Sequence, residues 1–320
     1  MKTKLVYVIV CKPSNLYFEQ CFASAWSAKY HNPDICIVAV MDQDSRNCIS
    51  PLAYENFESL IDEEIIHEFD SSVSSIERSR WLKTNLRAIV SGDFMYLDSD
   101  TLITGSLSSL DSMECSIGFV SDWNSSLSQN TSIFYYEKEL KKMFDQKMRM
   151  EGCYFNGGVF YAKDNKMAHQ FLNTWHENWK FCQSKGYYRD QLSLLKTTQD
   201  LHHLGDEIDG TYNCQLAASL EHLPKAKILH FYHLDFSYSF SPFFEKKVYE
   251  QIKEESCISQ NVQDMIINVK NIIYGPAKML GDENIEIIYS HTYKALNKIF
   301  RKHKLFYGIL QFMSRFYNKL

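Results

Sequence analysis

Residues 94–101 read FMYLDSDT, a short apolar run that ends in two aspartates separated by one serine. The apolar part is typical of a buried strand. Side chains two positions apart on extended backbone point to the same side, so we expect Asp98 and Asp100 to project together from the end of that strand. Two neighbouring carboxylates repel each other unless a cation lies between them, and such oxygen ligands suit Mg²⁺ or Mn²⁺. The stretch therefore predicts a divalent-cation site, with a turn whose side chains cap a helix as the alternative.

Upstream of this stretch, strand-like and helix-like segments alternate along the chain. Residues 4–10 and 35–40 are β-branched apolar runs, which are typical of parallel strands buried on both faces. We expect the order strand, helix, strand, helix, strand, helix, strand over residues 4–10, 17–30, 35–40, 51–61, 64–68, 75–91 and 94–97. This alternation predicts an α/β fold with a doubly wound, mostly parallel sheet, in which ligands bind beyond the carboxyl ends of the strands.

The composition excludes several classes of protein. With 45% hydrophobic and 23% charged residues among 320, the chain has enough apolar material for a globular core. No apolar run approaches the ~18–20 residues of a membrane span. The nine cysteines are scattered without the spacing of a zinc site or a disulfide framework. We therefore expect free thiols in a cytoplasmic protein.

The net charge of −5 hides an uneven distribution. Residues 290–320 contain five Lys, two Arg and no acidic residue, which leaves 27 basic and 39 acidic side chains in the rest of the chain. An acidic body argues against nucleic-acid binding. In the tail, apolar residues recur near helical spacing with basic residues between them, a pattern that suits an anionic membrane surface. We expect peripheral attachment to the inner face of the cell membrane; the alternative is that the tail packs on the acidic body.

Six segments in the same order resemble glycosyltransferase family 8, which includes glycogenin and bacterial lipopolysaccharide galactosyl- and glucosyltransferases. FMYLDSDT resembles the family's DxD strand. The other five are SRWLKTNL at 79–86, YFNGGVF at 154–160, RDQ at 189–191, TYN at 211–213 and ILHF at 228–231. Each motif alone is weak, but their shared order over about three-quarters of the chain is specific.

The resemblance implies an α/β fold of the GT-A type, a Rossmann-like, doubly wound mixed sheet that contains the DxD strand, followed by a C-terminal helical extension. We expect the catalytic domain over residues 1–245, the helical extension over 246–289 and the basic amphipathic tail over 290–320.

The resemblance also implies a metal site. Asp98, Asp100 and His230 would bind Mn²⁺ or Mg²⁺, with the histidine as a neutral third ligand. The two aspartates would also contact the donor, Asp100 at the diphosphate and Asp98 at the ribose. His233 is the rival ligand, three residues further on. The alternative for His230 is a buried histidine that only satisfies hydrogen bonds in the core.

Lys83 and Arg80 would bind the donor's diphosphate from the helix before the DxD strand. The family usually has a glycine and then a Lys-Pro-Trp element after the metal histidine, and both are missing after His230. Positive charge for the diphosphate must therefore come from elsewhere, with Lys83, Arg80 and Lys12 as the candidates. The alternative is that Lys83 and Arg80 are solvated helix charges one turn apart.

The remaining donor contacts come from two other segments. Asn156 and Gly157 belong to the FNGG motif, where an amide can hydrogen-bond sugar hydroxyls and a glycine lets the backbone approach them. Asn15 and Tyr17 stand near the position of the family's base-binding element. A plain turn before a strand is the alternative for the FNGG segment.

Asp190 and Gln191 are the expected catalytic residues. The resemblance implies that both side chains hydrogen-bond hydroxyls of the donor sugar and that the glutamine lies near the anomeric carbon. An amide is a poor nucleophile, so the resemblance implies transfer with retention by attack on the front face. Asp190 could alternatively serve only as a helix N-cap.

These features predict a metal-dependent hexosyltransferase. It would move a hexose from a nucleotide-diphosphate sugar, UDP-hexose, to a hydroxyl of a surface glycan or lipopolysaccharide-like glycolipid. A sugar-nucleotide pyrophosphorylase is one alternative, but it needs a Gly-rich basic loop after the first strand, and residues 11–17 read CKPSNLY. The other is a binding protein that keeps the fold without turnover, which the missing glycine and lysine after His230 would favour.

Overall fold

The computed structural model describes residues 1–127, 129–130, 133–150, 152–202, 204–232, 246–274 and 290–317. The chain divides into two compact units, Met1–Ile273 and Tyr274–Leu320. The boundaries expected at 245 and 289 both lie at the edges of undescribed segments, so that division of the chain stays a prediction.

The first unit alternates strands and helices, as the sequence predicts. Its strands are β1 (Lys4–Ile9), β2 (Ile37–Asp42), β3 (Glu63–His67), β4 (Phe94–Leu97), β5 (Thr101–Ile103), β6 (Ile117–Ser121), β7 (Phe155–Ala162), β8 (Gly205–Glu207), β9 (Cys214–Gln215) and β10 (Ile228–His230). The helices up to the unit boundary are α1 (Tyr17–His31), α2 (Gln43–Cys48), α3 (Pro51–Glu58), α4 (Ser75–Thr84), α5 (Leu86–Ile89), α6 (Ile133–Phe144), α7 (Lys166–Ser184), α8 (Gln191–Asp200), α9 (Lys246–Glu255), α10 (Gln260–Ile267) and α11 (Val269–Tyr274).

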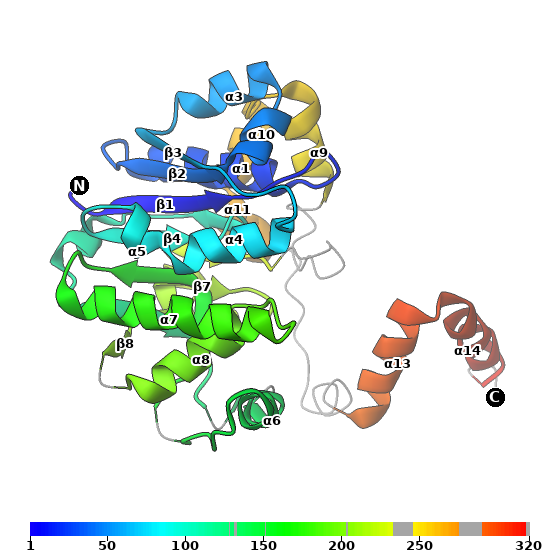
Figure 1. Ribbon diagram of the computed structural model, residues 1–320. Helices are drawn as coiled ribbons and strands as arrows, with labels where there is room; N and C mark the ends of the chain where they lie inside the picture. The colour runs from blue at the N-terminus through cyan, green and yellow to red at the C-terminus, as the bar shows by residue number, and fades with distance from the viewer. Residues whose placement is uncertain are drawn as a thin grey trace. The chain divides into compact units, whose positions relative to one another are not determined.

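The main sheet has the strand order β3-β2-β1-β4-β7-β6-β8 (Figure 1). The first four strands are parallel, and β7 runs antiparallel to both β4 and β6. The register places Val6 of β1 opposite Val38 of β2 and Tyr96 of β4. The expected doubly wound mixed sheet is therefore confirmed. A smaller sheet of order β5-β10-β9 lies beyond the end of β4.

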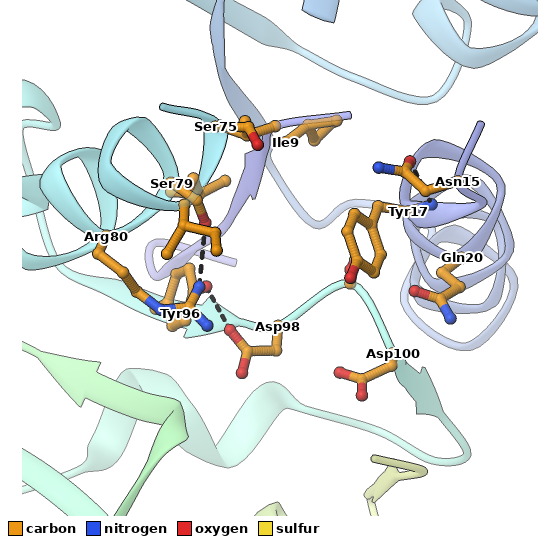
Figure 2. Close-up of a pocket in the computed structure, with 14 residues that line it drawn as sticks. Ile9, Asn15, Tyr17, Gln20, Ser75, Ser79, Arg80, Tyr96, Asp98 and Asp100 are labelled. Atoms are coloured by element: carbon orange, nitrogen blue, oxygen red, sulfur yellow. Dashed lines mark hydrogen bonds between the residues drawn. The ribbon is translucent and has the colours of Figure 1, made fainter. Parts of the chain in front are cut away.

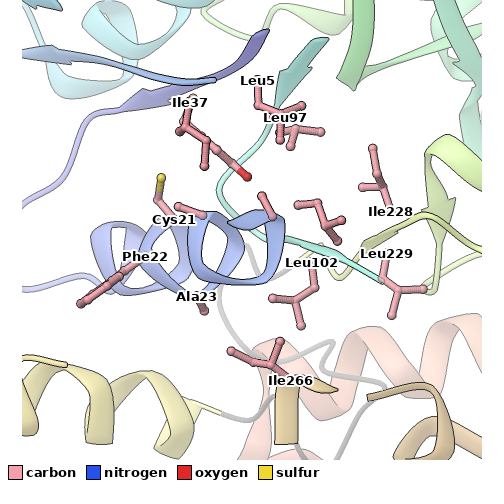
Figure 3. Packing of buried hydrophobic residues seen from close by; sticks show 14 of the residues in the cluster. Leu5, Cys21, Phe22, Ala23, Ile37, Leu97, Leu102, Ile228, Leu229 and Ile266 are labelled. Atoms are coloured by element: carbon pink, nitrogen blue, oxygen red, sulfur yellow. The ribbon is translucent and has the colours of Figure 1, made fainter. Parts of the chain in front are cut away.

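Strand β1 is buried on both faces, which explains its continuous apolar sequence. Leu5, Tyr7 and Ile9 belong to one core cluster, and Val6 and Val8 belong to another. Figure 3 shows the first cluster, in which α1 lies between strand side chains and α10. The second cluster includes residues of α4 and α7, which cover the opposite face (Figure 1).

The helix expected over residues 75–91 is interrupted at Asn85, which separates α4 from α5. Asn85 has φ −98° and ψ 7°, outside the helical range. The preceding Thr84 hydroxyl bonds to the carbonyl of Arg80 at 2.8 Å and also contacts His176 Nδ1 at 2.8 Å. A threonine bond to the carbonyl four residues earlier often bends a helix, and the interruption lies directly after this one.

Strand β7 begins at Phe155, the second residue of the YFNGGVF segment. The Asn156 and Gly157 backbones are therefore part of the sheet rather than of a turn in front of it. This placement aims the start of β7 at the end of β4, because the two strands are antiparallel neighbours.

The second unit contains α13 (His291–Lys302) and α14 (Lys304–Tyr317). The Ser290 hydroxyl caps α13 by accepting the Tyr293 amide. Leu305 is 86% exposed, and other apolar side chains of both helices are also exposed. None of the described helices has the length and hydrophobicity needed to cross a membrane.

Candidate active site

The two aspartates follow β4 at the point where the order of the sheet changes direction. From β1 the chain proceeds to β2 and β3 on one side, and β4 returns to the other side of β1. Such a switch point leaves a crevice at the carboxyl ends of the two strands. A cavity lies there, lined by the ends of β1 and β4 together with residues of α1 and α4.

Figure 2 shows how the cavity is built from opposite walls. Asn15 and Tyr17, at the start of α1, form one wall, and Arg80 of α4 stands on the other. Asp98 and Asp100 lie between these walls. The structure therefore brings five of the expected donor-site residues to one cavity.

Asp98, Asp100 and His230 come together beside this cavity. Each offers one ligand atom, and these atoms lie within 4.8 Å of one another. His230 Nε2 is 3.4 Å from Asp100 Oδ1, and His230 Nδ1 is 3.0 Å from Asn213 Oδ1. Since an amide oxygen only accepts, Nδ1 carries a proton, which leaves Nε2, the nitrogen nearer the carboxylates, as the one available to a metal ion. That is the tautomer a metal ligand needs.

Gly158 of β7 provides a test of whether these three side chains fit a cation. A Cβ at this position would lie 2.4 Å from His230 Cε1, 2.8 Å from Asp98 Oδ2 and 3.0 Å from Asn156 Oδ1. His230 and Asp98 can therefore lie this close to β7 only because residue 158 lacks a side chain. Two carboxylates and one imidazole suit Mn²⁺ or Mg²⁺, so the residues present fit the ion. The rival ligand His233 lies outside the described residues.

Lys83 is buried between two carboxylates rather than solvated. Its Nζ lies 2.9 Å from Asp190 Oδ2 and 3.2 Å from Asp98 Oδ1, and the residue is 3% exposed. Arg80 Nε lies 3.1 Å from Asp190 Oδ1. Burial alone would raise the pKa of Asp190, but the two cations hold that pKa well below its usual range. The interpretation of Lys83 as a solvated helix charge is therefore wrong.

Gln191 begins α8 and is fixed against the start of β7. Its Oε1 accepts the Gly157 amide at 3.3 Å, and its Nε2 donates to the Phe155 carbonyl. The Asp190 carbonyl accepts the Trp175 indole N–H at 3.2 Å. Asp190 makes no side-chain cap bond, so it does not act as the N-cap of α8. These contacts bring the expected catalytic pair next to the FNGG segment.

A buried polar network joins Asn156 to residues that the sequence did not single out. Asn156 Nδ2 donates to Asp122 Oδ1 at 2.9 Å and to the Tyr232 hydroxyl at 2.7 Å. That hydroxyl donates to Gln215 Oε1 at 2.6 Å, and Asn213 Nδ2 donates to Asn156 Oδ1 at 3.0 Å. The same Asn213 holds the metal-site histidine, so the network connects the expected sugar and metal sites.

Asp122 and Tyr232 occupy unusual states within this network. Burial raises the pKa of Asp122 to about 6, although hydrogen bonds oppose the shift. Tyr232 stacks on the His230 ring with centroids 4.2 Å apart and has φ 57°, a left-handed conformation that costs a non-glycine residue roughly 1–2 kcal/mol. One signal could have identified Asp122: it directly follows the apolar strand β6, as Asp98 directly follows β4. No comparable local signal marks Tyr232 or Gln215.

Comparison with known proteins agrees with this geometry. A model of glycosyl transferase family 8 matches residues 15–233. The structure of galactosyltransferase LgtC, in complex with donor and acceptor sugar analogues, aligns with a TM-score of 0.52 and 15% identity, covering 88% of this chain and 98% of that one. The bifunctional glycosyltransferase WbbM aligns with a TM-score of 0.54 and 14% identity over 82% of this chain and 51% of its own.

Mouse xyloside xylosyltransferase 1 also aligns, with a TM-score of 0.48 and 12% identity over 72% of this chain and 97% of its own. No curated protein sequence matches the chain. The likenesses to LgtC and WbbM establish the fold, which is the GT-A fold of those two glycosyltransferases. The family match spans more than two-thirds of the chain and includes most of the cavity and the whole Asp98, Asp100 and His230 group. The chain therefore belongs to glycosyl transferase family 8 and is a glycosyltransferase.

Proposed function

We propose that the enzyme transfers a hexose from UDP-hexose to a hydroxyl of a glycan or glycolipid, in a reaction that depends on Mn²⁺ or Mg²⁺. The observation that best supports this is the convergence of Asp98, Asp100 and His230, whose ligand atoms lie within 4.8 Å of one another, with Asp98 and His230 packed directly against Gly158. A divalent cation bound there supplies positive charge that offsets the negative charge developing on the leaving diphosphate.

The chain's own residues bind the donor from the two walls of the cavity. We assign the nucleotide end to Asn15 and Tyr17 and the diphosphate to Arg80 and Lys83. Arg80 lines the cavity, whereas Lys83 stands behind it and holds the Asp98 side chain through a contact of 3.2 Å between Lys83 Nζ and Asp98 Oδ1. Arg80 and Lys83 would thereby supply the positive charge that family members usually obtain from a lysine after the metal histidine, which this chain lacks after His230.

The sugar end is assigned to Asn156, Gly157, Asp190 and Gln191. Both amide atoms of Gln191 are bound to β7 backbone, so a neutral and weakly nucleophilic group is held at a fixed position. If that position faces the anomeric carbon, as the family resemblance implies, the group held there is an amide and not a carboxylate that could form a covalent intermediate. We therefore propose retention, with the acceptor hydroxyl attacking on the face from which UDP departs.

We assign the basic tail, residues 290–320, to an anionic membrane surface. The described part forms two helices that carry exposed aromatic and aliphatic side chains and no acidic residue. Each basic residue near such a surface contributes about 1 kcal/mol of attraction. The tail would bring the catalytic unit to a lipid-linked acceptor on the inner face of the cell membrane.

The experiment is a hydrolysis and transfer assay with UDP-glucose, UDP-galactose and their N-acetyl forms, with and without Mn²⁺. Mn²⁺-stimulated release of UDP from one of these donors supports the proposal. Tight donor binding without release would indicate the binding protein without turnover. Synthesis of UDP-sugar from UTP and a sugar 1-phosphate would instead indicate a pyrophosphorylase.

A further inference from the structure

The loop between β1 and α1, residues 10–16, separates two cavities. On one side lies the donor cavity, to which the loop contributes Asn15. On the other side lies a second cavity, lined by Cys11, Lys12, Pro13 and again Asn15, with Lys253 of α9 at its rim. The position of this loop therefore sets the wall of the donor cavity where the nucleotide end is expected.

Lys253 binds the loop from the side of the second cavity. Its Nζ donates to the Pro13 carbonyl at 2.7 Å and to the Asn15 carbonyl at 3.0 Å. The loop also has an internal turn, in which Asn15 N–H donates to the Lys12 carbonyl at 3.1 Å and Asn15 Oδ1 accepts the Tyr17 amide at 3.4 Å. The two bonds from Lys253 are charge-assisted, and bonds of that kind are roughly twice as strong as neutral ones.

Helix α9 presents Lys253 from a fixed position. Tyr249 and Ile252 are buried in the core cluster that also contains α1, and α9 packs against α1. Just after the helix, the Ser256 carbonyl accepts Asn56 Nδ2 at 3.0 Å. The amine therefore reaches the loop from a helix anchored by its apolar face and by its C-terminal end.

We propose that Lys253 is a positioning residue for donor binding. Helix α9 would then support the donor site through the loop, without lining the donor cavity itself. The proposal rests on the proposed function, because it takes this cavity to bind the nucleotide of the donor. Lys253 lies 20 residues beyond position 233, where the family match ends. Without the two bonds from Lys253, the loop would spend a smaller fraction of the time in the arrangement that binds the donor. The apparent donor affinity would fall in proportion to that fraction. The rate of the chemical step after binding would not change.

The test compares Lys253→Met, which keeps the apolar stem and removes the amine, with the parent chain. Donor KM should rise about five- to tenfold while kcat stays within about twofold. Lys253→Arg retains a cation with several N–H groups and should return donor KM to within about twofold. Lys253→Gln, which lacks the charge, should behave like the methionine variant, and melting temperatures show that each variant is folded.

Two control variants separate positioning from other effects. Glu19 Oε1 lies 3.9 Å from Lys253 Nζ, so Glu19→Gln removes the charge pair and keeps both loop bonds. Lys246→Met makes the same change at an exposed site on the same helix, where the lysine pairs with Glu250. Both should leave donor KM unchanged. An equal rise in KM in either control would overturn the positioning role.

Hydrogen exchange without any nucleotide tests the loop directly. Lys253→Met should speed amide exchange in peptides that cover residues 10–18, and Glu19→Gln should not. Unchanged exchange together with unchanged donor KM in Lys253→Met would refute the inference. If the parent chain neither binds UDP nor releases it from a donor, the proposed function fails instead, and exchange alone then decides whether Lys253 positions the loop.

Discussion

Two adjacent glycines of β7 offer a sharp test of the metal site. Gly158→Ala would place a Cβ 2.4 Å from His230 Cε1, whereas Gly157→Ala would place one 3.4–3.5 Å from Leu194 and Trp175. Neither glycine has a positive φ, so an alanine fits the backbone at both positions. The two substitutions therefore differ only in the room that each new methyl group has.

The expected magnitude follows from how tightly His230 is held. Carbon atoms in contact prefer about 3.5–4.0 Å, so the ring must move by roughly 1 Å to accept the new methyl group. The ring is bonded to Asn213 and stacked on Tyr232, and moving it disturbs both contacts. Overpacking of this kind costs about 1–3 kcal/mol of stability. Disturbing the partners that orient a metal ligand typically lowers metal affinity about 10–100-fold.

Calorimetric titration of the nucleotide-free protein with Mn²⁺ measures the effect. Gly158→Ala should weaken Mn²⁺ binding by that factor, and Gly157→Ala should bind Mn²⁺ as the parent does. Equal Mn²⁺ affinities for Gly158→Ala and the parent would show that binding of the ion does not depend on the position of the His230 ring beside Gly158. Equal losses in both variants would point to a general distortion of β7 and would also refute the reasoning.

Four further outcomes follow from the same site and from the tail. Asp100→Ala and Asp98→Ala should each abolish Mn²⁺-stimulated turnover, and near-normal turnover in both would refute the metal assignment. Lys83→Ala should raise donor KM and lower kcat together, and should lower the melting temperature because it leaves two carboxylates without their buried cation. Asp122→Asn should stabilise the protein at pH 8 by up to about 3 kcal/mol, since the raised pKa of Asp122, about 6, means that its ionisation opposes folding. Stability from the protonated group is complete below the unfolded pKa, near pH 4, and is lost as the pH rises through 6; melting curves from pH 4 to 8 should show the variant's advantage growing over that interval. Deleting residues 290–320 should preserve donor hydrolysis and abolish pelleting with phosphatidylglycerol vesicles at low salt; if the full chain ignores such vesicles, the membrane assignment is wrong.

The sequence predicts those parts of the fold that depend on local pattern. Strand β4 has the expected bounds, and α1 begins at the expected Tyr17, because apolar periodicity and flanking turn residues define them. The approach of Asp98 to His230 is also predictable once the family order is recognised. A strand that returns beside β1 must end at the crevice, and the small sheet carries His230 back to it through β5 and β10.

Other parts of the site depend on contacts between distant segments. Lys83 looks like an ordinary helix charge until β4 and α8 bring two carboxylates to it. Asn156 and Tyr232 are 76 positions apart in the chain, and their contact depends on how β7 and the end of β10 are packed. No pattern within either segment specifies such a pair. Sequence reasoning therefore identifies the candidate metal-binding side chains more readily than the residues that orient them through hydrogen bonds and ion pairs.

The balance of charge explains why the site is arranged in this way. Asp98, Asp100 and Asp190 bring three carboxylates together, and Lys83 and Arg80 supply two cations, both of which are engaged with Asp190. The interior is therefore already negative before a diphosphate enters, and a diphosphate adds further negative charge. Two protein cations cannot offset both sets of charges, whereas a divalent ion between the carboxylates and the diphosphate can. On this reasoning Lys83 and Arg80 hold Asp190 ionised and in place in addition to the charge that they offer the diphosphate, and the proposed divalent cation supplies the remaining positive charge.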